Sequence, residues 1–353
     1  MAKLEINLLG WNHKAEIGKS IESVLRQTYS DFELIYTDNA STDGSVDFVK
    51  KIFPQINIIA NSVNLGYAGA HNRFFRQSKS EFVMVLNPDV ELDKNFLEEA
   101  LKVFTDPKVA AVTGKMLLPR TKILDGTGIV VSRSRRARER GQHEEDNGKY
   151  DNKLEVFGVS GTAAIYRNSA LDAIKIPKLL PLADTSNKIF LLNKEGLGEV
   201  YNKEFEYIDE DFFAYFDDMD LSWRFRLAGY KCKFTPKAIV YHSRKASSST
   251  SGYNKVGEFI KHHKGLSQNI KRWNWKNHLF CIIKNDFGWP LWRDLPFILL
   301  RELAMFVFIL VFETRTLGAV PQFFRELPVM LKKRQYIQSH RQVDSKVAGE
   351  WFK

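Results

Sequence analysis

The sequence predicts an α/β fold: a mostly parallel, doubly wound, Rossmann-like sheet followed by a helical C-terminal extension. Residues 82–86 are five consecutive apolar residues, typical of a strand buried on both faces, and Pro88 prevents that strand from continuing. Before and after it, strand-like segments alternate with segments of helical periodicity, the order that produces a parallel sheet. Asp89 is therefore expected at the carboxyl end of a central strand, where open α/β sheets bind ligands.

The elements follow in order along the chain. Residues 4–9 are expected to form the first strand, and residues 16–26 carry apolar side chains at helical spacing. A second strand is expected at 32–36, and the Ser and Asp residues of the segment 38–44 can cap the next helix. The remaining expected elements are a helix at 45–53, a strand at 56–60, a helix at 70–77, the strand at 82–86 and a helix at 94–104.

Three polar clusters are predicted to meet at one edge of this sheet: Gly10-Trp11-Asn12, Asp38-Asn39 and Asn87-Pro88-Asp89. A nucleotide site is the natural interpretation, although turn residues would also be polar. The chain has neither a Gly-x-Gly-x-x-Gly opening a helix nor a Gly-x-x-x-x-Gly-Lys-Ser/Thr motif. Phosphates would therefore need another source of positive charge, and a metal ion on Asp89 would supply it.

A second acidic centre is expected at the start of a later helix. Asp217, Asp218 and Asp220 precede Leu221 and Phe225, which share one helical face, and Gly229 ends this helix. Capping and compensation of the helix dipole would require only one acid. Three acids exceed that need, and their mutual repulsion could raise one pKa into the range of a general base.

Six stretches occur in the order found in one enzyme family. Residues 4 to about 245 resemble the inverting family-two glycosyltransferases of the GT-A fold, most closely the rhamnosyltransferase-like branch. No single stretch is specific, but their order is. The matching stretches are Glu22–Tyr29, Asp38–Ser45, Asn64–Asn72, Asn87–Asp89, Val159–Ala163 and Phe212–Arg224.

The resemblance implies a donor pocket on the sheet edge. Asp38 resembles the acid that holds the base or ribose of a sugar nucleotide, with Trp11 and Asn12 lining the same pocket. Its alternative role is that of a turn residue capping the next helix. The other residues assigned to donor binding by the matching motifs are Asn64, Gly66, Asn72 and Asn87.

The resemblance also implies a divalent metal, Mg²⁺ or Mn²⁺, held against the donor diphosphate. Asp89 resembles the last acid of the family's Asp-x-Asp motif. Asn87 replaces the first acid, so metal binding should be weaker, although its amide oxygen could contact the metal or a phosphate. His242 matches a histidine that some members use as a further metal ligand, and a structural role is the alternative.

The same resemblance assigns the catalytic residues. Asp218 would be the general base that takes the proton of the acceptor hydroxyl, and Asp217 would orient or bind the acceptor. The reaction would then be a single, inverting displacement without a covalent intermediate.

The last part of the chain has a different composition. The whole chain of 353 residues has a formal charge of +10, and residues 261–353 contain 16 Lys and Arg against 7 Asp and Glu, a balance of +9. Leu303–Phe312 is apolar but has only ten residues, whereas a bilayer core of ~30 Å needs about 20. With nearby tryptophans at 273, 275, 289 and 292 and a basic segment at 332–334, this pattern indicates helices lying on an anionic membrane. We therefore expect a catalytic domain at 1–255 and a membrane-associating region at 256–353.

Other interpretations of this region remain open. It could be a helical subdomain packed on the catalytic domain or on a second copy of the chain, as in a homo-oligomer. No nucleic-acid-binding motif accompanies the charge, so we expect no nucleic-acid partner. Two cysteines, Cys232 and Cys281, cannot form a disulfide framework, and no leader-like segment opens the chain. We expect a cytoplasmic protein, peripheral on the inner face of the cell membrane.

Three further segments are less specific. Residues 133–140 contain five arginines, which we expect in a solvated loop, the alternative being contact with phosphates or anionic lipid. Residues 176–205 look like an insertion near the acceptor site. Residues 247–252 suit a loop closing over the donor or a plain linker.

Together the sequence predicts an inverting, metal-dependent glycosyltransferase. It would move a sugar, with rhamnose from dTDP-rhamnose as first candidate and UDP-sugars next, to a polyprenyl-linked or cell-surface glycan precursor. The alternative is an inactive nucleotide-sugar-binding or scaffold protein at the membrane, against which the intact Asp38, Asp89 and Asp218 argue. A processive synthase is disfavoured because we expect no full transmembrane helix and find no Gln-x-x-Arg-Trp motif.

Overall fold

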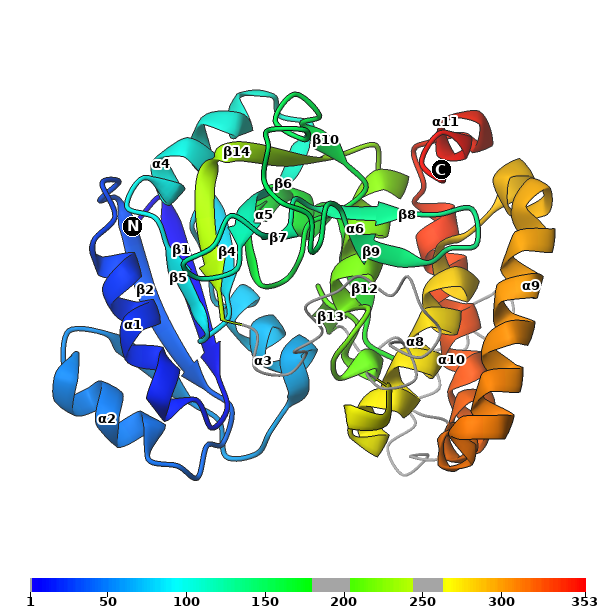
Figure 1. The fold of residues 1–353 in the computed structure, drawn as a ribbon, viewed down its shortest axis with the longest axis horizontal. Coiled ribbons are helices and arrows are strands. Elements are labelled where there is room, and N and C mark those ends of the chain that lie inside the picture. The colour runs from blue at the N-terminus through cyan, green and yellow to red at the C-terminus, as the bar shows by residue number, and fades with distance from the viewer. Residues whose placement is uncertain (1, 180–203, 244–262) are drawn as a thin grey trace, which may run out of the picture.

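The computed structural model describes residues 2–179, 204–243 and 263–353. An α/β body holds the N-terminal two thirds of the chain, and a block of helices lies beside it (Figure 1). Most of the segment 176–205 and all of 247–252 lie outside the described residues.

The strands and helices confirm the predicted order through residue 104. The strands are β1 (Leu4–Gly10), β2 (Phe32–Asp38), β3 (Asn57–Ala60), β4 (Phe82–Leu86), β5 (Val90–Leu92), β6 (Val109–Leu117), β7 (Leu124–Gly126), β8 (Ile129–Val131), β9 (Ala137–Glu139), β10 (Glu155–Val156), β11 (Ala163–Arg167), β12 (Ile176–Pro177), β13 (Phe205–Glu206) and β14 (Lys231–His242). The α-helices are α1 (Lys14–Leu25), α2 (Ser45–Ile52), α3 (Gly66–Phe75), α4 (Phe96–Leu101), α5 (Asn168–Ile174), α6 (Asp217–Leu227), α8 (Gln268–Asn285), α9 (Gly288–Phe312), α10 (Val320–Ser339) and α11 (Ser345–Gly349). The helix expected at 94–104 is shorter, because its last turn is the 3-10 helix Lys102–Thr105.

The central sheet has the strand order β10-β14-β6-β11-β4-β1-β2-β3. Strands β4, β1, β2 and β3 are parallel, as predicted. Strand β11 runs antiparallel between β4 and β6, and β5 pairs antiparallel with the end of β14. The sheet is therefore parallel in its N-terminal half and mixed beyond it.

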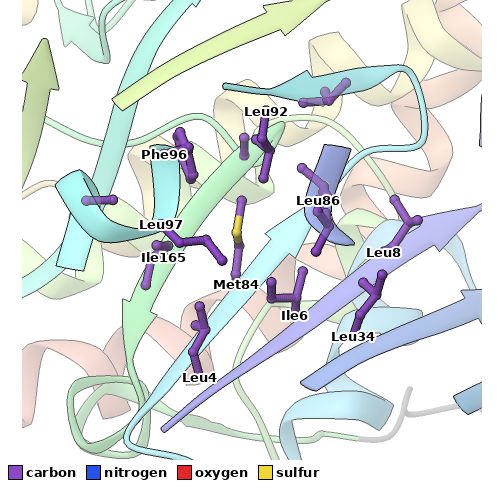
Figure 2. Close-up of a cluster of buried hydrophobic side chains, with 14 of the residues drawn as sticks. Leu4, Ile6, Leu8, Leu34, Met84, Leu86, Leu92, Phe96, Leu97 and Ile165 are labelled. Atoms are coloured by element: carbon purple, nitrogen blue, oxygen red, sulfur yellow. The ribbon is translucent and has the colours of Figure 1, made fainter. Parts of the chain in front are cut away.

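Helices cover both faces of this sheet, and the alternation of side chains along each strand explains why. Met84 and Leu86 of β4 join the apolar layer under α1, α2 and α4, whereas Val83 and Val85 join the layer under α3, α5 and α6. Figure 2 shows Met84 between the neighbouring strand β1 and Phe96 of α4. Burial of both faces of β4 fixes the strand, and with it the position of the segment 87–89 that follows.

The C-terminal helices are joined to the α/β body by apolar contacts. Phe212 packs with Phe280 of α8 and Met330 of α10, all of them buried. The last residues of the chain also return to the body, where Phe352 joins Trp223 of α6. The expectation that this region packs on the catalytic domain is therefore met for α8, α10 and α11.

A buried ion network strengthens this junction. Lys333 of α10 contacts Glu206 and Asp209 at 2.5 Å, and it also contacts Asp211. Lys284 of α8 pairs with Asp209, and its ammonium lies 3.0 Å from the carboxylate of Asp220. Burial by itself would raise the pKa of Asp209, but the two lysines hold that pKa below its usual range. Lys284 and Lys333 were part of the positive charge that suggested membrane binding, but they neutralise carboxylates of the α/β body.

Because of this network, removing the C-terminal region would affect the fold of the α/β body. The proposed boundary between 255 and 256 lies among residues outside the described ranges. A chain ending there would lose Lys284 and Lys333 and leave Glu206, Asp209 and Asp220 buried without these partners. The C-terminal helices are therefore part of the folding unit that holds the acidic segment.

The expectation that residues 133–140 form a solvated loop is wrong, because Arg135 is buried and residues 137–139 form β9. Arg135 is fully buried and adopts a left-handed backbone with φ of 62°. Its guanidinium pairs with Asp286 at 2.7 Å and Asp294 at 2.9 Å, and it lies over the ring of Phe352. The carboxylates sit far along the chain, so the sequence segment alone did not reveal them. Arg135 therefore connects the body to the start of α9.

Helix α9 is longer than the ten-residue apolar segment Leu303–Phe312 suggested. It has 25 residues, about 37 Å at 1.5 Å per residue, and its most apolar 18-residue window has a mean hydropathy of 2.3 and is only 11% buried. By length and composition it could therefore cross a membrane, as some buried and signal helices also could. The exposed apolar face, named here the α9 face, consists of Trp289, Trp292, Phe297, Leu299, Leu300, Leu303, Phe306, Val307, Leu310, Val311 and Phe312.

The four tryptophans do not form one interfacial cluster. Trp289 and Trp292 are 65% and 67% exposed on α9. Trp273 instead stacks on Phe213, with ring centroids 4.8 Å apart, and Trp275 contacts Phe323 of α10. Only Trp289 and Trp292 belong to the α9 face.

The ion network yields a stability prediction. Replacing Lys284 by Met should lower the free energy of unfolding by about 3–5 kcal/mol, because the buried carboxylates of Asp209 and Asp220 would each lose one of their two cations. Urea denaturation followed by circular dichroism measures the change. The control Lys346→Met, at an exposed position of α11, should stay within about 0.5 kcal/mol. Equal urea midpoints for Lys284→Met and the unchanged chain would contradict a supporting role for the network.

Candidate functional site

The first two polar clusters meet where β1 and β2 end side by side. Gly10 pairs with Asp38 in the parallel register, and the amide of Asn39 donates to the carbonyl of Gly10 at 2.8 Å. Asp38 is 2% exposed, and its two oxygens accept from the hydroxyl of Tyr36 at 2.7 Å and the amide of Ser41 at 2.8 Å. These contacts give Asp38 a role within the turn, but Asp38 does not cap α2, whose N-cap is Gly44. Contact of Asp38 with a donor stays a prediction.

The loop that carries Trp11 and Asn12 is held against this turn. Asn12 has a left-handed backbone with φ of 59°, and its amide donates to the hydroxyl of Ser41 at 2.9 Å. In return, its side-chain oxygen accepts from the amide of Thr42 at 2.8 Å. Trp11 is 51% exposed, so its ring is accessible at the edge of the sheet. An accessible aromatic ring beside a fixed polar turn suits a base or a ribose.

The motif at 64–72 forms the start of α3. The side-chain oxygen of Asn64 accepts from the backbone amide of Gly66 at 2.8 Å and from the side-chain amide of Asn39. The next amide, that of Tyr67, donates to the carbonyl of Phe213 at 2.7 Å. A Cβ on Gly66 would lie 2.5 Å from that carbonyl oxygen, and the φ of +71° also favours glycine. The glycine therefore allows the segment before Asp217 to approach the donor side.

Asn72 occupies a different place from the one predicted. It is fully buried, and its side chain bonds the backbone of Tyr207 and Ile208 and the carboxylate of Glu210. The structure thus gives Asn72 a structural role: it fixes the start of the acidic segment to α3. This role requires an amide because both a donor and an acceptor are used.

Asp89 and His242 are brought together by strand pairing. Val90 pairs with His242 between β5 and β14, and Nε2 of His242 lies 3.5 Å from a carboxylate oxygen of Asp89. Nδ1 of His242 lies 2.7 Å from the carboxylate of Asp125 on β7. Burial would lower the pKa of His242, but the two carboxylates outweigh burial and raise it to about 9. Burial would likewise raise the pKa of Asp89, but the bond to His242 lowers it.

This arrangement fits a divalent cation. Asp89 offers a carboxylate oxygen and a neutral His242 would offer Nε2, and these two atoms lie 3.5 Å apart. A carboxylate on the far nitrogen of a histidine is also the usual partner that orients a metal ligand. No group of three His, Cys, Asp or Glu that could hold a metal is found among the described residues. The chain would therefore supply two ligands, and phosphate and water would supply the rest.

The segment leading into α6 is strained. Phe213, Tyr215 and Phe216 all have positive φ, at 61°, 70° and 64°, which costs on the order of 1–3 kcal/mol each for residues other than glycine. The side chain of Asn277 on α8 donates to the carbonyls at 212, 214 and 215 at 2.9–3.0 Å. This conformation sets the starting direction of α6 and thus the position of the two acids at 217 and 218.

Asp218 lies at the mouth of a pocket of about 170 Å³ formed by β8, β9, α6 and α8. Its carboxylate accepts from the amides of Met219 at 2.8 Å and Gly161 at 3.3 Å. Burial raises its pKa, while these two amides favour the charged form. Burial and the charge of Asp218 raise the pKa of Asp217 well above its ordinary value. A carboxylate that lines a pocket and has a raised pKa can take a proton, and the role of Asp218 as general base stays a prediction.

The third acid of the cluster has a separate role. Asp220 is fully buried and bonds the guanidinium of Arg224 at 3.0 Å, the side chain of Asn285 at 2.7 Å and the ammonium of Lys284. Its two oxygens are occupied by the ion network. The excess of acids noted in the sequence thus divides into one structural acid and two at the site.

The two centres are connected by the end of β4. The amide of Asn87 donates to the carbonyl of Thr162 at 2.9 Å, next to the Gly161 amide that reaches Asp218. A Cβ on Gly161 would lie 2.5 Å from the hydroxyl of Tyr67, so glycine is required for this approach. These two hydrogen bonds link the segment that carries Asp89 to the amide that contacts Asp218.

Sequence reasoning missed the supporting residues of this site. Asp125, Asn277 and Lys284 lie far along the chain from the residues they hold. Asp125 follows an apolar segment as an isolated acid, and Asn277 and Lys284 lie in a helix with residues of every kind. Only the tertiary contacts identify them.

Comparisons with known proteins agree with this geometry. The sequence model described as glycosyl transferase family 2 matches residues 11–175. An N-acetylglucosaminyl-diphospho-decaprenol L-rhamnosyltransferase of Mycobacterium tuberculosis is 24% identical over 255 residues, which are 69% of this chain and 76% of that protein. A poly-beta-1,6-N-acetyl-D-glucosamine synthase of Staphylococcus aureus is 25% identical, over 65% of this chain and 47% of the synthase.

Solved structures show the same fold at low sequence identity. Residues 1–349 of TarS from S. aureus match with a TM-score of 0.51 at 15% identity, over 96% of this chain and 87% of theirs. The mannosyltransferase PcManGT of Pyrobaculum calidifontis, solved with GDP-Man and Mn²⁺, matches with a TM-score of 0.50 at 13% identity, over 99% and 87%. With the motifs and the mixed sheet, these findings show that the chain is a glycosyltransferase with a GT-A-like fold, and its residues 11–175 are similar to glycosyl transferase family 2.

Proposed function

We propose that this glycosyltransferase is metal-dependent and inverting, and that it transfers a sugar from a nucleoside diphosphate to a lipid-linked glycan precursor. One observation carries the proposal: Asp218 opens into a pocket and is joined through Gly161, Thr162 and Asn87 to the sheet edge that carries Asp89. A donor on that edge and an acceptor in the pocket would meet between the two acids. Rhamnose is the first candidate sugar, because the M. tuberculosis relative is an L-rhamnosyltransferase.

The geometry supports a single displacement. The acceptor hydroxyl oxygen would attack the anomeric carbon while Asp218 takes the hydroxyl proton. The bond between the anomeric carbon and the diphosphate oxygen breaks, and the nucleoside diphosphate leaves from the opposite face, so the configuration is inverted. Asp217, whose pKa is raised further, would stay protonated and could donate to the acceptor.

Asp89 and His242 would hold Mg²⁺ or Mn²⁺, with Asp125 orienting the imidazole. The ion would supply positive charge that stabilises the leaving diphosphate. The mannosyltransferase neighbour was solved with Mn²⁺, which supports a divalent ion without selecting between the two.

The α9 face supports attachment to a membrane at the cytoplasmic surface. In Figure 1, α9 forms the outer edge of the helical block, and its apolar side chains are exposed. Arg315 and Arg325 are exposed on the segments that follow, which favours anionic lipid. Because Asp294 and Ile298 of α9 are buried against the protein, we propose that α9 lies on the bilayer instead of crossing it.

Two other functions are less well supported. An inactive scaffold would not need a buried carboxylate opening into a pocket beside a strained loop. A processive synthase can no longer be set aside for lack of a long apolar helix, since α9 is one. Gln268–Trp273 differs from the Gln-x-x-Arg-Trp motif by one inserted residue, so the motif itself is absent.

The base assignment predicts a large kinetic effect. Asp218→Asn should lower kcat by about 10²–10⁴-fold and leave donor affinity nearly unchanged, because the amide cannot take the proton. Transfer from a panel of sugar nucleotides to a lipid-linked acceptor measures kcat, and calorimetry measures donor affinity. Near-normal turnover would assign the base to Asp217, since Asp220 is held in the ion network.

The metal assignment predicts loss of ion dependence. Asp89→Ala should abolish stimulation by Mg²⁺ or Mn²⁺ and weaken binding of the nucleoside diphosphate, because one of two protein ligands is removed. Activity titrated with each ion, and calorimetry with the diphosphate, provide the measurements. Equal activity in excess chelator and in excess metal would disprove the metal dependence.

The α9 face predicts membrane binding of a particular kind. The protein should sediment with anionic liposomes and be released by alkaline carbonate. Leu300→Asn with Val311→Asn should weaken binding at least tenfold, since burying each side chain is worth about 1.5–3 kcal/mol. Val63→Asn, at an exposed site of the catalytic body, is the control.

The other outcomes of this experiment assign α9 differently. Release by detergent alone would make α9 a spanning helix. A protein that ignores liposomes and forms a salt-insensitive dimer dissociated by Leu300→Asn would make the α9 face an oligomer interface.

A further inference from the structure

A second cavity lies beyond the pocket of Asp218. It has a volume of about 370 Å³ and lies between α8 and α9. Ala137, Phe216 and Asn274 line both this cavity and the pocket beside Asp218, so the two spaces adjoin. Its size is within the range of about 300–1,000 Å³ typical of small-molecule sites. We call it the α8–α9 cavity.

The lining of the α8–α9 cavity is both cationic and apolar. Arg136, Lys271 and Arg301 supply three cations. Two carboxylates accompany them: Glu313 lies 3.1 Å from Lys271, and Glu302 pairs with Arg301. The remaining wall is largely apolar and includes Trp275, Met305 and Ile309. The cavity therefore suits a ligand with an anionic group attached to an apolar part.

The orientation of α9 indicates where the apolar part of such a ligand would extend. Arg301, Met305 and Ile309 are spaced four residues apart and line the cavity on one side of the helix. The neighbouring side carries Leu300 and Leu303 of the exposed α9 face. A ligand in the cavity could therefore continue past α9 along an apolar surface.

We propose that the α8–α9 cavity binds the diphosphate and first isoprenoid carbons of a prenyl-diphosphate-linked acceptor, placing the attached sugar at Asp218. This inference rests on the proposed function, and it adds the position of the acceptor's charged end. A diphosphate carries more negative charge and more acceptor oxygens than the carboxylates that now contact Lys271 and Arg301, so it can compete for them. Under the proposed function, the donor nucleotide would instead lie at the ends of β1 and β2.

Farnesyl diphosphate below its micellar concentration is the probe, titrated calorimetrically into full-length protein that has been saturated with UDP or dTDP. Saturation blocks the donor site. We expect the unchanged chain to bind and Lys271→Met with Arg301→Met to bind at least about tenfold more weakly. Ala304→Phe should also weaken binding, because it fills the cavity and leaves the charges in place. The control Lys51→Met, at an exposed site of α2, should bind normally.

Several results would overturn the proposal: no binding by the unchanged chain, equal binding by the cavity variants, or displacement of farnesyl diphosphate by UDP or dTDP. Inorganic pyrophosphate and farnesol form two further arms. If pyrophosphate alone binds as tightly as farnesyl diphosphate, the cavity is an anion site and the lipid part of the proposal fails.

Hydrolysis of sugar nucleotides, measured separately, distinguishes this proposal from the proposed function. Cavity variants should hydrolyse the donor at the normal rate. Lack of any sugar-nucleotide hydrolysis or transfer by the unchanged chain would instead count against the proposed function, whatever the cavity binds.

Discussion

The pairing of Lys284 and Lys333 with buried carboxylates is the interaction on which the rest of this structure depends. Three buried acids, Glu206, Asp209 and Asp220, lie in or near the segment that leads into α6, and without cations their burial would be prohibitive. The two lysines come from α8 and α10, so the catalytic segment and the C-terminal helices fold together. Asn277 then completes the segment by binding its carbonyls. The helices after residue 263 are thus an integral support of the acidic centre.

Much of the fold could be predicted, because it follows from local patterns. The strands of the parallel half and the helices between them have clear periodicity, and Pro88 ends β4 where expected. The mixed half was less predictable, since β11 inserts between β4 and β6 by pairing that no local signal specifies. Charge was the most misleading signal: Arg135 and Lys333 read as surface residues until their acids, more than a hundred residues away along the chain, are placed beside them.

The candidate site shows the same division. Motif residues such as Asp89, His242 and Asp218 lie where a glycosyltransferase would need them, and their roles stay predictions. Asn72 lies in the motif yet serves the fold, because a buried amide that bonds four backbone or side-chain groups is as restrictive as a ligand contact. Asp125 was absent from the predicted site, since a histidine's partner on its far nitrogen can come from any strand.

The bonds between the start of α3 and the carbonyl of Phe213 have a consequence for how this join can vary. Both partners are backbone atoms, so the bonds themselves need no particular side chain at 213 or 67. They need particular backbone conformations instead: Gly66 and Phe213 both have positive φ, and Gly66 also lies too close to that carbonyl oxygen to carry a Cβ. The join between α3 and the segment before α6 therefore depends on the shape of the backbone more than on side-chain chemistry.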